Sequence, residues 1–141
     1  MLNREEKNKL KIIESTIGKK LERFSIKQKQ LYKECYYVEE KQFIIDLQIE
    51  SIQINKFPES ITDLLHLKRL SMIDNKISKI PHSIAKLKYL EILRLQRNRI
   101  KKIPKCIGAL ENLKHLNLER NKLKHLPKQI GNLNSLKGLV F

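Results

Sequence analysis

The decapeptide LQRNRIKKIP, residues Leu95–Pro104, carries four cations within six positions: Arg97, Arg99, Lys101 and Lys102. Guanidinium and ammonium groups at this density can bind phosphate or carboxylate groups, and short basic runs are typical of nucleic-acid contacts and localisation signals. The run is nevertheless interrupted at regular spacings by Asn98 and by apolar residues. The charges therefore have to be interpreted together with the elements that position them.

Residue types suited to catalysis or metal binding are scattered along the chain. The two cysteines, Cys35 and Cys106, form no CxxC pair, and the four histidines follow no metal-ligand spacing. Only four glycines are present and none belongs to a phosphate-binding loop motif, nor is there a nucleophile elbow or a pair of acids. We therefore expect no enzyme activity, no metal and no cofactor.

The chain is strongly basic, with 30 Lys and Arg against 15 Asp and Glu and a formal net charge of +15. Such a charge favours an anionic partner. However, 23 of the 30 cations are Lys, and Ile and Asn are also frequent, which is the usage expected from AT-rich coding. The sequence leaves both explanations of the charge open.

No apolar stretch is long enough for a signal peptide or a membrane-spanning helix. Two cysteines without a pairing pattern are typical of a reducing compartment. We expect a cytoplasmic monomer.

An internal repeat of 23 residues organises the chain. Asparagines recur at this interval at Asn75, Asn98 and Asn121, and prolines at Pro58, Pro81, Pro104 and Pro127. The apolar positions recur with them and give the unit LxxLxLxxNxIxxIPxxIxxLxx, three times without an insertion. Such a fixed period predicts stacked units that share one continuous core.

This unit resembles the leucine-rich repeat, and its IP or LP step is similar to the Ras-suppressor type. The resemblance implies an α/β repeat solenoid, a right-handed superhelix with a concave parallel β-sheet. The expected repeats are 44–66, 67–89, 90–112 and 113–135, followed by a partial repeat at 136–141. Residues 1–43 do not repeat and are expected to cap the first unit.

Local patterns agree with this expectation. Residues Leu93–Leu95 alternate apolar and polar as a half-buried strand does, and the following proline predicts a turn and a short helical or 3₁₀ return segment. Each asparagine amide is expected to satisfy backbone groups where the chain bends. Ile52 takes the asparagine position of repeat 44–66, so the asparagine ladder should begin one repeat later.

The two ends differ from the middle. Asn3 and Glu6 predict a helix start, Gly18 predicts its end, and residues 35–49 predict a hairpin that leads into the first repeat. At the other end, the last strand is either tolerated as an edge, covered by a partner, or continued in a longer scaffold protein.

The outward positions of the predicted strands form the first candidate site. They are Arg69, Ser71, Ile73, Asp74, Ile92, Arg94, Gln96, Arg97, His115, Asn117, Glu119 and Arg120. Arginine and histidine beside an exposed isoleucine are typical of protein interfaces. We expect a non-enzymatic module that binds a protein partner on this concave face, and the family resemblance implies a role in intracellular signalling.

A second candidate site lies along the edge that follows the asparagines. It consists of Lys76, Arg99 and Lys122, backed by Lys79, Lys101, Lys102, Lys105, Lys124 and Lys128. This basic edge predicts the alternative function, binding of a polyanion such as an acidic protein, an anionic membrane surface or a nucleic acid. Repeat 44–66 is different, because one Lys against four acidic residues gives it a net charge of −3.

Overall fold

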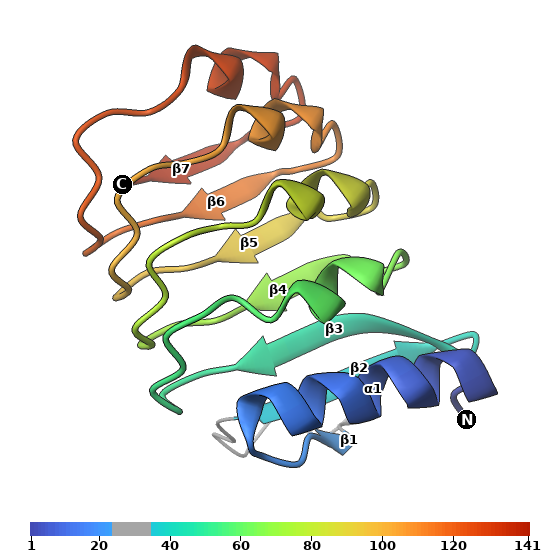
Figure 1. The fold of residues 1–141 in the computed structure, drawn as a ribbon. Helices are drawn as coiled ribbons and strands as arrows, with labels where there is room; N and C mark the ends of the chain where they lie inside the picture. The colour runs from blue at the N-terminus through green and yellow to red at the C-terminus, as the bar shows by residue number, and fades with distance from the viewer. Residues whose placement is uncertain (24–34) are drawn as a thin grey trace.

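The computed structural model describes residues 1–23 and 35–141. One helix, α1 (Arg4–Ile17), precedes a single sheet whose strands lie side by side in sequence order. The strands are β1 (Glu22–Arg23), β2 (Cys35–Glu40), β3 (Phe43–Ile49), β4 (Arg69–Ser71), β5 (Ile92–Arg94), β6 (His115–Asn117) and β7 (Gly138–Val140). Figure 1 shows α1 at one end of this stack and β7 at the other.

Strands β3 to β7 form the predicted parallel sheet. Their pairing aligns Leu47, Leu70, Leu93, Leu116 and Leu139, one residue from each coil. Strand β5 begins one residue earlier than the sequence predicts, although pairing continues past its end, since the amide of Leu95 donates to the carbonyl of Asn117 at 2.8 Å. A register fixed at 23 residues keeps equivalent side chains adjacent in neighbouring coils.

Four 3₁₀ segments return the chain after each strand and turn, as the repeat predicts. They are η1 (Glu59–Asp63), η2 (His82–Lys86), η3 (Lys105–Ala109) and η4 (Lys128–Asn132). Each follows a proline whose extended backbone ends the preceding segment, and the third residue after that proline donates back to its carbonyl, as Ile61 does to Pro58 at 3.0 Å. These segments form a second row beside the sheet (Figure 1).

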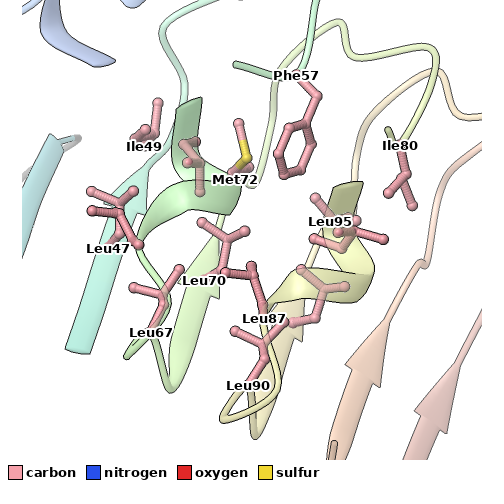
Figure 2. Packing of buried hydrophobic residues seen from close by; sticks show 14 of the residues in the cluster. Leu47, Ile49, Phe57, Leu67, Leu70, Met72, Ile80, Leu87, Leu90 and Leu95 are labelled. Carbon is pink, nitrogen blue, oxygen red and sulfur yellow. The ribbon is translucent and has the colours of Figure 1, made fainter. Parts of the chain in front are cut away.

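The core lies between the sheet and the row of 3₁₀ segments. Figure 2 shows Leu47, Leu70 and Leu87 pointing into this interior, where all three are fully buried. Burial decreases in coil 113–135, in which Leu123 and Leu126 are only half-buried whereas their equivalents one coil earlier are buried. Each coil therefore buries its apolar side chains partly against the next coil.

The asparagine side chains hydrogen-bond the backbone at each bend. The amide nitrogen of Asn98 donates to the carbonyls of Met72, Leu95 and Gln96 at 2.8, 3.0 and 3.3 Å, and its oxygen accepts from the amide of Ile77 at 3.0 Å. Asn75 and Asn121 repeat this pattern one coil earlier and one coil later. The ladder begins with Asn75, which bonds the carbonyl of Ile49 in the first coil at 2.9 Å.

Helix α1 has the predicted ends, and its Glu6 also contacts strand β3. The side-chain oxygen of Asn3 accepts from the amide of Glu6 at 2.9 Å, and Gly18 ends the helix with a φ of 70°. The Glu6 carboxylate does not return to the amide of Asn3. It is 2% exposed and accepts from the amide of Ile44 at 3.1 Å, which ties the helix to strand β3.

The predicted hairpin is formed by β2 and β3, which pair antiparallel. Its turn residues, Lys41 and Gln42, have φ values of 47° and 71°, as a tight two-residue turn between twisted strands requires. The buried side chains of α1, among them Leu10, Ile13 and Ile17, join the same core cluster as the repeats. Residues 24–34 of the predicted 1–43 cap lie outside the described residues.

Replacing Asn98 with Ala should lower the free energy of unfolding by about 2–4 kcal/mol, because three carbonyls and one amide at a buried bend lose their partner. Urea unfolding followed by circular dichroism measures the loss. Asn55→Ala is the matched control and should change stability by less than about 0.5 kcal/mol, because Asn55 is exposed and its side chain makes no hydrogen bond with residues 1–23 or 35–141. Equal effects at the two positions would contradict the structural role of Asn98.

Replacing Glu6 with Ala should lower the free energy of unfolding by about 1–3 kcal/mol, since the buried amide of Ile44 loses its acceptor. Glu5→Ala is the control, because Glu5 is exposed and only pairs with Lys9 on the helix surface. The same urea titration compares the two variants. If Glu5→Ala were the more destabilising of the two, the link from Glu6 to strand β3 would not matter for stability.

Candidate binding site on the concave face

The sheet register brings the predicted concave residues into two ladders. Arg69, Ile92 and His115 are direct partners on adjacent strands, and Ser71, Arg94 and Asn117 form the second row. Parallel strands lie about 4.8 Å apart, so side chains in one ladder can contact the same bound molecule. We call this surface the concave face.

The remaining predicted residues lie where each strand bends into the turn. Ile73, Gln96 and Glu119 continue the parallel pairing, as the amide of Asp74 donates to the carbonyl of Gln96 at 3.1 Å. The next residue in each coil has a left-handed backbone, with φ of 55°, 57° and 55° at Asp74, Arg97 and Arg120. These three side chains therefore lie at the rim of the concave face.

A depression of about 320 Å³ lies on the concave face at its N-terminal end. Four of its residues are predicted by the repeat, whereas the contribution of the first coil and the hairpin is not. The full lining is Tyr36, Asp46, Gln48, Arg69, Leu70, Ser71, Ile92 and Arg94. The sequence did carry a signal for Asp46, which stands one period before Arg69, whereas Tyr36 enters the site only through the pairing of β2 with β3.

The two arginines of the depression have different surroundings. Arg69 donates from Nε to a carboxylate oxygen of Asp46 at 2.8 Å, which fixes its side chain. Arg94 is exposed, and its guanidinium makes no hydrogen bond or ion pair with residues 1–23 or 35–141. Arg94 therefore keeps its planar donor fork available, and the half-buried Ile92 lies next to Arg69 in the ladder.

Ser71 differs from the expectation of an exposed contact residue. It is only 7% exposed, and its hydroxyl hydrogen-bonds to the carboxylate of Glu50 from the preceding coil. The acidic first coil therefore covers part of the concave face. Ser71 supports the site by holding Glu50 in place instead of being open to solvent.

Burial dominates the electrostatics of this corner. It raises the pKa of Asp46 even though the neighbouring Arg69 favours the charged form. Burial likewise raises the pKa of Glu50, against the hydrogen bond from Ser71, and that of Tyr36, with a further contribution from the charge of Asp46. Partial desolvation thus disfavours the charged forms of both acids.

The basic edge is formed as the period predicts, with Lys76, Arg99 and Lys122 exposed in successive coils. Their backbone amides donate to the carbonyls of Ile54, Ile77 and Ile100 at 2.8, 2.8 and 2.9 Å. These hydrogen bonds keep the three residues aligned across the coils. None of the three side chains pairs with an acid in the described part of the chain. In the same residues, no set of three His, Cys, Asp or Glu is placed to hold a metal ion, and no helix has the length and apolarity needed to cross a bilayer.

The chain matches a protein-family model. This model is described as a leucine-rich repeat region and matches residues 42–141. The chain belongs to the leucine-rich repeat family. Its fold is the leucine-rich repeat solenoid, and domains of this family generally serve as protein-interaction scaffolds. No match was found among curated proteins.

Solved leucine-rich repeat structures are similar to this one. A leucine-rich repeat protein from Leptospira interrogans is 38% identical with a TM-score of 0.67, over 69% of this chain and 25% of that one. A chain of the BIR3–SERK2 complex from Arabidopsis thaliana is 34% identical with a TM-score of 0.67, over 76% of this chain and 60% of that one. The ectodomain of the Arabidopsis receptor kinase SOBIR1 is 23% identical with a TM-score of 0.72, over 96% and 77%, and supports the fold alone. The chain spans between 16% and 60% of the first three structures it matches.

The stability of the Asp46→Asn variant relative to the parent should increase as pH rises. Because the pKa of Asp46 is raised by folding, its contribution is fully present below the unfolded pKa of about 3.8 and is lost as pH rises through the folded pKa. The difference in unfolding free energy between Asp46→Asn and the parent should therefore shift in favour of the variant from about pH 3 to about pH 7. Urea titrations at several pH values test this trend, and a difference that moves the opposite way would show that the pair with Arg69 outweighs burial.

Proposed function

We propose that this protein is a non-enzymatic interaction module that binds a segment of a partner protein on its concave face. The observation that carries the proposal is the open guanidinium of Arg94 within the depression, next to the half-buried Ile92. A planar fork binds a carboxylate through two parallel hydrogen bonds, and an adjacent apolar side chain excludes water from such a pair.

The two arginines of the depression have different roles in the proposed binding. Arg69 is fixed by its ion pair with Asp46. Arg94 interacts electrostatically with Asp46 and Glu50 but makes no hydrogen bond or ion pair with the described residues, so its guanidinium can donate to a carboxylate of the ligand. The partner segment that fits best therefore presents a carboxylate to Arg94 and an apolar side chain to Ile92. Arg97 lies at the rim, where the chain bends after strand β5. It adds a second cation that can pair with another acidic group of the ligand.

Similar proteins support a role in binding. One similar structure is a chain of the BIR3–SERK2 complex, and another is a plant peptide hormone receptor, RGFR1, in complex with RGF2. Both are structures of complexes. The partner of the present chain is proposed from the chemistry of Arg94 and Ile92. A signalling role rests only on the resemblance of its repeats to the Ras-suppressor type.

Replacing Ile92, Arg94 and Arg97 with Ala should abolish partner binding on the concave face and leave thermal melting nearly unchanged, because none of the three is fully buried. The measurement is affinity purification from the native cell with quantitative mass spectrometry, comparing the parent with the triple variant. The expected result is at least a tenfold loss of specific partners, which corresponds to about 1.4 kcal/mol.

A triple variant on helix α1, Arg4→Ala, Lys11→Ala and Ile12→Ala, serves as the matched control. All three of its residues are exposed, and it changes two cations and one isoleucine, as the concave variant does. Its bound partners should match those of the parent. If the concave variant retained every partner of the parent, the concave face would not be the binding site.

A further inference from the structure

A cationic groove separates the turns of coils 90–112 and 113–135, away from the concave face. It consists of two adjoining depressions of about 430 and 460 Å³ that share Lys102 and His125. Seven basic residues line it: Lys101, Lys102, Lys105, Lys122, Lys124, His125 and Lys128. No acidic residue lines either depression. We call this feature the basic groove.

The basic groove concentrates positive charge without internal compensation. None of its six lysines forms an ion pair or a side-chain hydrogen bond with any residue that the structure describes. The 23-residue period places Lys101 beside Lys124 and Lys105 beside Lys128 on neighbouring coils, which lie about 4.8 Å apart where they pair. Like charges on neighbouring coils repel one another, and an anion bound between them removes that repulsion.

The depression of about 460 Å³ has an apolar floor, whereas the adjoining one is lined by lysines and His125 alone, and this combination restricts the chemistry of a bound molecule. Ile103, Leu126 and Pro127 contribute to this floor, with Ile103 only 6% exposed and the other two half-buried beneath exposed lysines. Because these apolar groups are recessed, a flat membrane surface cannot reach them while it contacts the lysines. An occupant that uses both features must carry negative charge and apolar side chains on one narrow chain.

Single-stranded nucleic acid fits the basic groove less well than a peptide does. Bases need aromatic side chains for stacking, and the lining contains only the imidazole of His125. The cations are also ammonium groups, which lack the planar fork that binds phosphate in two places but pair readily with separate carboxylates. An extended peptide repeats its side chains on one face about every 6.6 Å, so acidic residues can reach the lysines while apolar ones meet the floor.

We infer that the basic groove binds an extended acidic peptide segment with interspersed apolar side chains, at a site separate from the concave face. The lysines of both coils bind its carboxylates, and Ile103, Leu126 and Pro127 contact its apolar side chains. The chain would thus hold a partner at two places, one on the sheet and one at the turns.

Fluorescence anisotropy with the full chain tests this inference at 150 mM salt. The probe is a labelled twelve-residue peptide in which Glu alternates with Leu, compared with a peptide of equal charge in which Ser replaces Leu. The Leu peptide should bind at least tenfold more tightly, because only it has side chains for the apolar floor. Equal affinity of the two peptides would overturn the role of the floor, and no binding of either would overturn the site.

Charge reversal locates the binding. Lys102→Glu with Lys124→Glu should weaken binding of the Leu peptide at least tenfold, whereas Lys7→Glu with Lys11→Glu on helix α1 makes the same change in net charge and should leave it within about twofold. Both pairs are exposed, so thermal melting should be unchanged. The concave triple variant should also bind the peptide normally, which separates this site from the proposed concave one. An equal loss in both charge-reversed variants would mean that only net charge attracts the peptide.

Two further probes decide between classes of partner. Vesicles of phosphatidylserine and phosphatidylcholine, and a twelve-nucleotide oligo-dT, are measured under the same conditions with the parent and with Lys102→Glu, Lys124→Glu. Both should bind more weakly than the Leu peptide. Tighter binding of either probe that is lost in this variant would assign the basic groove to a membrane surface or to a nucleic acid and overturn the peptide.

Discussion

The bend that ends each strand is the constraint on which this solenoid depends. A chain that leaves a parallel sheet once in every coil exposes carbonyls and amides that have no partner in the ladder, and burying them unpaired is costly. The side chain of Asn98 satisfies four such groups from two neighbouring coils. A bend held in this way repeats identically, so the 3₁₀ return segment and the next strand begin at the same place in every coil. The regular core follows from that repetition.

A framework defined by its inward residues leaves the outward ones free to vary. The concave face and the basic groove are carried by the same coils but occupy different positions of the repeat, the strand and the turn. On the strands, Asp46 of the acidic first coil fixes Arg69, whereas Arg94, in the neighbouring ladder, makes no hydrogen bond or ion pair with the described residues. At the turn, by contrast, lysines accumulate from coil to coil without an acid among them. The same 23-residue period thus produces two different surfaces. On the concave face an acid pairs with one of the arginines, whereas no acid lines the basic groove.

Most of the fold could be predicted from the sequence, because it depends on spacing. The 23-residue period was sufficient for the parallel sheet, the 3₁₀ returns and the positions of Asn75, Asn98 and Asn121. Interactions that cross from one type of element to another could not be predicted in this way. The contact between Glu6 and the amide of Ile44 depends on how α1 packs against β3, and the place of Tyr36 in the depression depends on the register of the hairpin. The burial of Ser71 likewise depends on Glu50 of the preceding coil.

The direction of the asparagine ladder has a consequence for synthesis of the chain. Asn98 bonds Met72 and Ile77, which precede it by one coil, so each coil is completed by a side chain from the coil that follows. A ribosome releases the chain from its N-terminus, and domains begin to fold in that order. Every new coil therefore waits for about 23 further residues before its bend is fully hydrogen-bonded. During that interval helix α1 and the β2–β3 hairpin, which have already been synthesised, can cover the apolar side of the first coil, because their buried side chains belong to the same core.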